Sequence, residues 1–203
     1  MKIICVGLNY RKHAAEMGRP LPQEPMIFLK PDSALLKKNK PFFLPDFSKN
    51  LQYEAEVVLR ISKLGKGIAA KYAHRYYDAL TMGIDFTARD LQHRFSQAGH
   101  PWELSKTFDG SAPVGTFIPA EKFPDHAAIG FTLEVNGEMR QEGNTSDLIF
   151  GFSEIIAYVS RYYTLKTGDL IFTGTPSGVG TVKKGDNLVA RMAGESVLDF
   201  FVR

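Results

Sequence analysis

The stretch LQYEAEVVLRI, residues 51–61, places two glutamates two positions apart in an otherwise apolar run. Its Tyr, Val, Leu and Ile residues favour a strand, and side chains alternate across a strand, so Glu54 and Glu56 are predicted to share one face. At a separation of about 6 Å and an effective dielectric of about 20, two carboxylates repel each other by roughly 3 kcal/mol before solvent screening. Either that face is solvated, or a cation lies against it.

A third carboxylate stands at the end of a second apolar run, LTMGIDFTARD (80–90). Asp85 has two interpretations: it caps the helix that is expected to begin near Thr87, or it joins Glu54 and Glu56 around one point. Three carboxylates together suit Mg²⁺ or Mn²⁺, which prefer oxygen ligands. The sequence has no cysteine and histidine cluster of the kind that binds zinc.

The rest of the chain predicts an α+β fold in which β-structure predominates, because short apolar runs alternate with Gly, Pro, Asn and Asp. Asn136-Gly137, within FTLEVNGEMRQ, is a preferred pair for a two-residue hairpin turn. No repeat or linker interrupts the pattern, so one domain over 1–203 is expected. The expected strands are 2–6, 26–29, 51–61, 79–86, 129–135, 137–141, 170–173, 187–191 and 197–202, and the expected helices are 11–17, 87–98 and 152–163.

Composition and charge restrict the classes of function. A formal net charge of +3 over 203 residues is compatible with small anionic substrates and too mild to predict nucleic-acid binding. The single cysteine, Cys5, fits a reducing compartment. No apolar window reaches the length of a membrane span, and polar residues from Asn9 onward interrupt the first apolar run, which argues against a signal peptide. A cytoplasmic protein with no membrane partner is therefore expected.

Two further features are candidates for acid–base chemistry. His13 and Glu16 are three residues apart in NYRKHAAEM (9–17), so on a helical turn the carboxylate would orient the imidazole. The same spacing is also common on solvated surface helices. Lys106, in SKTFDG (105–110), is either a cation at the site or an ordinary surface lysine.

The glycine-rich stretch TGTPSGVGTVKKGD (173–186) does not have the spacing of a nucleotide-binding loop. Gly178 and Gly180 lack a third glycine at position 183, and no Gly-Lys-Ser or Gly-Lys-Thr follows. We interpret the stretch as a turn-rich loop. The alternative is a ligand loop, whose backbone amides and the hydroxyls of Thr173 and Thr175 would bind a small carboxylate.

Six motifs, in this order, resemble those of a known family: GLNYRKHAAE (7–16), YEAEVVL (53–59), GIDFTARDLQ (83–92), SKTFDGSAPVG (105–115), VNGEMRQ (135–141) and GDLIFTGTPSGVG (168–180). On these motifs the chain resembles the fumarylacetoacetate hydrolase family. PWELSKTFD is most similar to the acylpyruvase-type members, including those active on oxaloacetate. Ile84 and Phe86 depart from the Asn and Val that many members carry in GNDVTARD, which bears on the substrate class and touches no ligand position.

The resemblance implies a mixed β-sandwich roll with a few short helices, usually a homodimer, that uses Mg²⁺ or Mn²⁺. It also implies a role for each matching residue, including a dyad on a short helix that orders over the bound ligand. The implied metal ligands are Glu54, Glu56 and Asp85; the implied catalytic residues are His13, Glu16 and Lys106; the implied substrate contacts are Arg89, Gln92 and Thr175.

The activity expected first is metal-dependent hydrolysis of 3-acylpyruvates, such as acetylpyruvate or fumarylpyruvate, at the C3–C4 bond. In that scheme His13 activates water, while the metal and Lys106 stabilise the pyruvate enolate that leaves. Oxaloacetate decarboxylation or tautomerisation and dienedioate isomerisation are alternatives that use the same metal–enolate site. A more remote alternative is a non-catalytic metal-binding protein.

Overall fold

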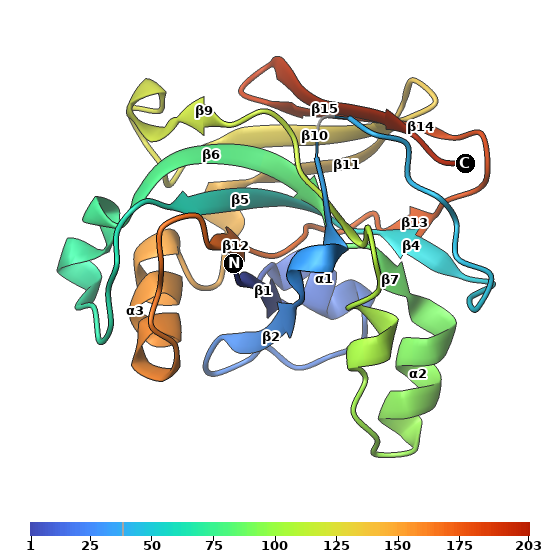
Figure 1. Cartoon of the computed structure of the whole chain (residues 1–203), viewed down its shortest axis with the longest axis horizontal. Coiled ribbons are helices and arrows are strands. Elements are labelled where there is room, and N and C mark those ends of the chain that lie inside the picture. The colour runs from blue at the N-terminus through green and yellow to red at the C-terminus, as the bar shows by residue number, and fades with distance from the viewer. Residues whose placement is uncertain (38) are drawn as a thin grey trace.

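The computed structural model describes residues 1–37 and 39–203, which form two larger sheets, two smaller ones and three α-helices (Figure 1). The largest sheet has the order β2-β1-β12-β5-β6-β9, in which β1 and β12 run parallel and the other neighbours are antiparallel. Its strands are β1 (Ile3–Gly7), β2 (Met26–Lys30), β5 (Ala55–Ile61), β6 (Tyr77–Ile84), β9 (Ile118–Pro119) and β12 (Leu170–Phe172).

The second large sheet is antiparallel, with the order β11-β10-β14-β15. Its strands are β10 (Gly130–Val135), β11 (Glu138–Asn144), β14 (Asn187–Met192) and β15 (Glu195–Phe201). The smaller sheets consist of β13 (Gly180–Thr181), β4 (Leu51–Tyr53) and β7 (Thr87–Ala88), and of β3 (Leu35–Leu36) and β8 (Ala112–Pro113). The predicted mixed, mostly β architecture is therefore confirmed.

Three helices flank the sheets: α1 (Arg11–Glu16), α2 (Arg89–Gln97) and α3 (Phe152–Tyr162). The apolar face predicted for α3 is buried through Phe152, Ile155, Ile156 and Val159. None of the helices in the described ranges has the length and apolar character that crossing a bilayer would require.

Two of the boundaries that differ from the sequence prediction lie next to the three carboxylates. The expected strand 51–61 is interrupted at Glu54, because residues 51–53 pair with β7 and β13 while 55–61 enter the six-stranded sheet. The expected helix 87–98 begins only at Arg89, because Thr87 and Ala88 form the short strand that pairs with β4. Pairing partners distant in sequence decide both boundaries.

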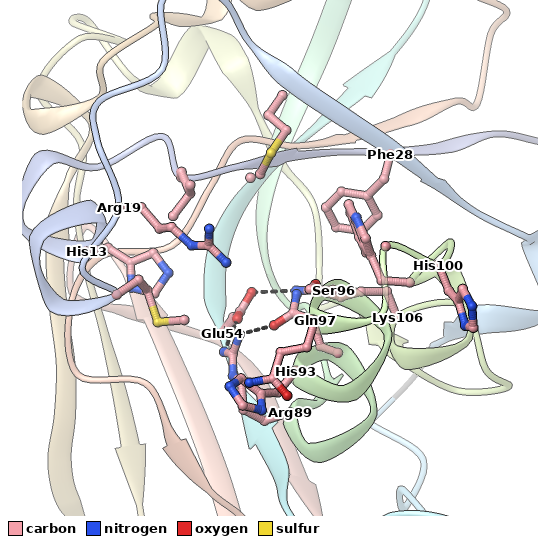
Figure 2. Close-up of a pocket in the computed structure, with 17 residues that line it drawn as sticks. His13, Arg19, Phe28, Glu54, Arg89, His93, Ser96, Gln97, His100 and Lys106 are labelled. Carbon is pink, nitrogen blue, oxygen red and sulfur yellow. Dashed lines mark hydrogen bonds and ion pairs between the residues drawn. The ribbon is translucent and has the colours of Figure 1, made fainter.

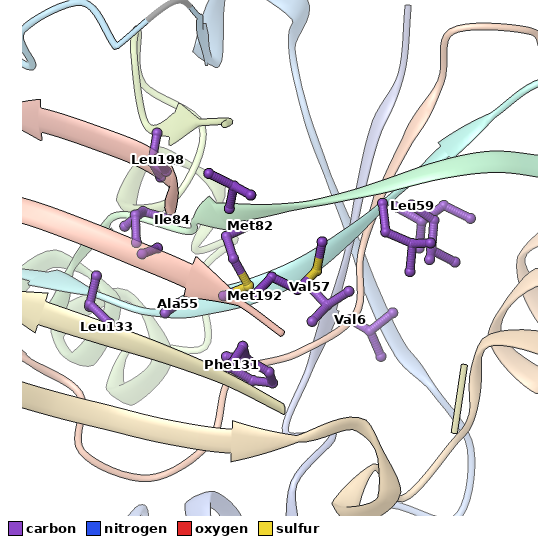
Figure 3. Packing of buried hydrophobic residues seen from close by; sticks show 14 of the residues in the cluster. Val6, Ala55, Val57, Leu59, Met82, Ile84, Phe131, Leu133, Met192 and Leu198 are labelled. Carbon is purple, nitrogen blue, oxygen red and sulfur yellow. The ribbon is translucent and has the colours of Figure 1, made fainter. Parts of the chain in front are cut away.

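The core lies between the two large sheets (Figure 3). From β5, Val57 and Leu59 point into this core and meet Phe131 of β10 and Met192 of β14 within one buried cluster. Val58, on the other face of β5, belongs to a second cluster with Cys5, Phe28 and Phe172. Because side chains alternate, the face of β5 that carries Val58 is also the face of Glu56.

The hairpin predicted at Asn136-Gly137 is confirmed. Strands β10 and β11 are antiparallel neighbours on either side of it, and both turn residues have positive φ, 55° for Asn136 and 79° for Gly137. Two positive φ values are what the tight hairpin turn with the native twist requires.

Asn9 fixes the chain between β1 and α1. Its side chain is fully buried; Nδ2 donates to the carbonyls of Thr173 at 2.8 Å and Phe150 at 3.0 Å, and Oδ1 accepts from the Phe150 amide at 2.8 Å. One amide side chain thus joins the start of α1 to the end of β12 and to the loop before α3.

Replacing Asn9→Ala is expected to lower the free energy of unfolding by about 3 kcal/mol, because the buried Thr173 carbonyl and two partly buried backbone groups of Phe150 lose their partner. Equilibrium unfolding in urea measures this value. The matched control is Asn144→Ala, which removes one local hydrogen bond from the Ser146 amide and is expected to cost less than about 1 kcal/mol. Equal losses in the two variants would contradict the anchoring role of Asn9.

Candidate active site

Three carboxylates meet on the β5 face described above. Ligand-type oxygens of Glu54, Glu56 and Asp85 all lie within 4.8 Å of one another. The residues are 5%, 2% and 1% exposed, so the solvated interpretation of the Glu54 and Glu56 pair is wrong. Water does not screen the repulsion here, and neighbouring positive charge must offset it.

Local backbone geometry brings the three together. Glu54 lies where the chain passes from β4 to β5, and Asp85 directly follows β6, which pairs with β5 in the register Ala55 to Ile84. The Asp85 amide donates to the Glu54 carbonyl at 2.8 Å. Helix α2 has Ala88 at its N-terminal boundary and no side-chain cap, so the interpretation of Asp85 as a helix cap is wrong.

Two lysines lie against the triad. The ammonium of Lys106, which is 3% exposed, donates to Glu54 Oε2 and to Asp85 Oδ2, both at 2.7 Å. Lys30 Nζ forms an ion pair with Asp85 Oδ1 at 2.7 Å and donates to the carbonyl and hydroxyl of Ser111, each at 3.0 Å. The surface interpretation of Lys106 is therefore wrong.

Burial and neighbouring charges shift the pKa values of Glu54 and Glu56 in opposite directions. Burial alone would raise the pKa of Glu54, but the ammonium of Lys106 and the guanidinium of Arg89 outweigh burial and lower it to about 2. Glu56 has the opposite shift: burial first, then the charges of Asp85 and Glu54, raise its pKa well above the ordinary value. Burial alone would lower the pKa of Lys106, and the carboxylates of Asp85 and Glu54 raise it instead.

The donor set fits a divalent cation. All three side chains offer carboxylate oxygens, the ligand type that Mg²⁺ and Mn²⁺ prefer. Both oxygens of Asp85 lie 2.7 Å from an ammonium group, Oδ1 from Lys30 and Oδ2 from Lys106. In contrast, burial and the neighbouring carboxylates raise the pKa of Glu56, so this carboxylate is the least compensated of the three. A divalent cation would supply the missing charge.

The predicted dyad forms beside the triad. His13 Nδ1 lies 3.0 Å from Glu16 Oε2 on α1, and His13 is buried. Because a carboxylate accepts, Nδ1 is assigned the proton, which leaves Nε2 free as the basic nitrogen. His13 lines the pocket and Glu16 holds it from behind.

The glycine-rich loop after β12 binds two of the protein's own carboxylates. The Gly174 amide donates to Glu56 Oε2 at 2.7 Å, and the Gly178 amide donates to Glu16 Oε1 at 3.1 Å. Gly178 has φ of +96°, and a Cβ there would lie 2.4 Å from the Arg140 carbonyl oxygen, so glycine is required. The loop positions one predicted metal ligand and the dyad, and these two amides are not open to a small ligand as the alternative supposed.

A pocket of about 640 Å³ opens over this site (Figure 2). Its walls come from the end of β1, from α1 and the residues after it, from β2, and from one face of α2 with the loop that follows. His13, Glu54 and Lys106 reach its surface, whereas Glu56 and Asp85 do not line it.

The three predicted substrate contacts differ in their surroundings. Arg89 and Gln92 line the pocket, where Arg89 donates to Glu54 Oε1, to Gln92 and, at 2.8 Å, to Gln52. Thr175 is buried, accepts a hydrogen bond from Gln141 at 2.9 Å and does not line the pocket. The contacts of Arg89 thus hold Glu54 in place, and Thr175 braces the loop.

Two supporting residues escaped the sequence analysis. Lys30 ends the strand MIFLK, where the only signal was a lysine in an apolar strand. Gln141 accepts from the Ala55 amide at 2.9 Å and donates to the Pro176 carbonyl at 3.0 Å, so it ties the turn between the two glutamates to the glycine-rich loop. Its motif, VNGEMRQ, marked the segment without indicating this role.

Comparisons with known proteins identify the family. The family model described as fumarylacetoacetate hydrolase C-terminal matches residues 2–202. The oxaloacetate tautomerase FAHD1, mitochondrial, of Mus musculus is 43% identical over 201 residues, which cover 99% of this chain and 91% of the relative. The oxaloacetate tautomerase YcgM of Escherichia coli K12 is 39% identical over 197 residues, covering 97% and 90%.

A solved structure shares the fold. The fumarylpyruvate hydrolase of Pseudomonas aeruginosa, in complex with Mn²⁺ and pyruvate, superposes with a TM-score of 0.94 at 37% identity, covering all of this chain and 89% of the other. The match of a family model over nearly the whole sequence, together with relatives above 30% identity, shows that the chain belongs to the fumarylacetoacetate hydrolase family.

Proposed function

We propose that the protein is a divalent-metal-dependent oxaloacetate tautomerase, which interconverts the keto and enol forms of this 2-oxo acid. The observation that carries the proposal is the convergence of a histidine base and a lysine cation on a pocket that is also lined by Glu54, one member of the buried carboxylate triad. The names of the mouse and Escherichia coli relatives support this alternative better than the acylpyruvate hydrolysis expected first.

The reaction moves one proton. The C3–H bond of the keto form breaks, its electron pair forms the C2–C3 double bond, and the 2-oxygen gains a proton to give the enol. We infer that Glu54, Glu56 and Asp85 hold Mg²⁺ or Mn²⁺, which when bound polarises the 2-oxo group.

The chain's own residues supply the proton transfer. Nε2 of His13 accepts the proton from C3 and, as the imidazolium, returns it to the 2-oxygen, while Glu16 holds Nδ1–H and stabilises that imidazolium. The ammonium of Lys106, held at the triad by Glu54 and Asp85, offsets the negative charge that develops on the 2-oxygen. Nothing in this scheme requires a nucleophilic water, which hydrolysis would need in addition.

Acylpyruvate hydrolysis is the second candidate, favoured by the similarity to the fumarylpyruvate hydrolase. A substrate panel separates the two reactions. With oxaloacetate, a tautomerase changes the enol absorbance without releasing CO₂, whereas a decarboxylase releases it. Acetylpyruvate would yield acetate and pyruvate only with a hydrolase. Hydrolysis of acetylpyruvate much faster than tautomerisation of oxaloacetate would overturn our preference.

Replacing His13→Ala is expected to lower kcat for tautomerisation by about 100- to 10,000-fold, the usual loss on removing a general base. Glu16→Gln should lower it by about tenfold, because the imidazole keeps its place and loses only the charged partner. The enol absorbance gives both rates. His74→Ala is the matched control, since His74 is exposed and does not line the pocket, and it should retain full activity. Retained activity in His13→Ala would contradict the assignment of the base.

Replacing Glu56→Gln is expected to raise stability without metal and to abolish stabilisation by metal. Because burial and two carboxylates raise the pKa of Glu56, the free energy of unfolding falls as the pH rises from about 4.5 to the folded-state pKa, and the loss stays constant above it. Near neutral pH the neutral amide should therefore stabilise the metal-free protein by about 1–2 kcal/mol. The free energy of unfolding of the wild-type protein should instead rise by about 2.7 kcal/mol when the Mg²⁺ concentration is a hundred times its Kd.

Urea unfolding in chelator and in Mg²⁺ tests both halves of this prediction. Glu142→Gln is the matched control, because Glu142 is exposed and should show neither effect. A Glu56→Gln protein that still gained stability from Mg²⁺ would remove Glu56 from the ligand set.

The oligomeric state and the cellular location of the protein remain predictions. A homodimer is expected from the family resemblance, and light scattering of the purified protein would measure its mass. A cytoplasmic location is expected from the sequence, whereas the name of the mouse relative describes that protein as mitochondrial.

A further inference from the structure

The pocket is lined by more cationic than anionic side chains. Three permanent cations line it, namely Arg19, Arg89 and Lys106, against one lining carboxylate, Glu54. Arg89 and Lys106 both form ion pairs with Glu54. Arg19 forms no ion pair with any residue in the described part of the chain. Its charge is therefore available to a ligand.

The end of α1 fixes where Arg19 lies. The Gly18 amide donates to the Ala15 carbonyl at 3.0 Å and the Arg19 amide to the Ala14 carbonyl at 2.9 Å, with Gly18 at φ of +60°. This pair of bonds is the Schellman arrangement, in which a left-handed glycine turns the chain back over the helix end. Arg19 is thus held at the C-terminal end of α1, the helix that carries His13.

The side chain of Arg19 extends into the pocket. Figure 2 shows its guanidinium pointing inward from the His13 side, across from the wall that carries Phe28, His100 and Lys106. The guanidinium is exposed, has five donors and is always protonated, so it suits a carboxylate.

We propose that Arg19 determines specificity by binding the substrate carboxylate that is remote from the triad, so that the site selects 2-oxo dicarboxylates over 2-oxo monocarboxylates. The inference rests on the proposed function, in which the 2-oxo end lies at the triad and His13 faces C3. In oxaloacetate the second carboxylate is bonded to C3. A group on C3 lies beside His13, and Arg19 enters the pocket next to His13.

The test compares oxaloacetate with pyruvate, which lacks the second carboxylate. Trp102 is the single tryptophan, lines the pocket and packs edge-to-face on Phe28 at 5.1 Å, so its fluorescence should report binding independently of turnover. Titrations in Mg²⁺ should show that Arg19→Gln weakens oxaloacetate binding by about 10- to 100-fold and pyruvate binding by less than about threefold.

Two variants control the measurement. Arg19→Lys keeps the charge without the planar fork and should restore part of the affinity. Lys12→Gln removes the same charge from an exposed residue of α1 that does not line the pocket, and should leave both ligands unaffected. In turnover, Arg19→Gln should raise KM with little change in kcat, because a contact remote from the transferred proton is made equally in the ground and transition states.

The outcomes separate this inference from the proposed reaction. Oxaloacetate binding that depends on Arg19 supports the inference even in a protein that shows no tautomerase activity. Unchanged oxaloacetate binding in Arg19→Gln would overturn the inference. So would a loss of pyruvate affinity in Arg19→Gln equal to the loss of oxaloacetate affinity, or an equal loss of oxaloacetate affinity in Lys12→Gln. Each of these results would mean that Arg19 is only a solvated surface residue. An unaltered urea unfolding curve checks that Arg19→Gln remains folded.

Discussion

The balance of charge around three buried carboxylates governs the construction of this site. Glu54, Glu56 and Asp85 lie out of water within 4.8 Å of one another, so each needs a positive charge or a hydrogen-bond donor that the fold itself provides. Lys106 supplies charge to two of them, and the Gly174 amide supplies a donor to Glu56. The raised pKa of Glu56 indicates that its carboxylate is the least compensated of the three.

The surrounding scaffold keeps this arrangement rigid. Asn9 joins α1 to the end of β12, Gln141 joins the hairpin to the turn between the two glutamates, and Gly178 joins the glycine-rich loop to Glu16. Each link connects segments that are more than 80 residues apart. The His13–Glu16 dyad, Lys106 and the carboxylate triad therefore share a single, well-connected support.

Much of the site was predictable because its residues occur in short motifs. The two-residue spacing of Glu54 and Glu56 predicted that they would meet, although the strand is interrupted at Glu54, and the i, i+3 spacing paired His13 with Glu16. Lys30 was not predictable, because nothing local distinguishes a strand-end lysine that is exposed from one that is buried against Asp85. The same limit applied to Glu54, where pairing with β7 ended a strand that propensity alone would have continued.

The sequence by itself determined the mostly β fold, the hairpin at Asn136-Gly137 and the identity of the chemical groups, since periodicity, turn residues and motif spacing are local properties. Only the tertiary structure decided which of these groups meet. It buried the triad, turned the amides of the glycine-rich loop toward Glu56 and Glu16, and left Arg19 in the pocket without a carboxylate partner among the described residues. Burial and charge pairing depend on segments that are distant along the chain, and local sequence does not specify them.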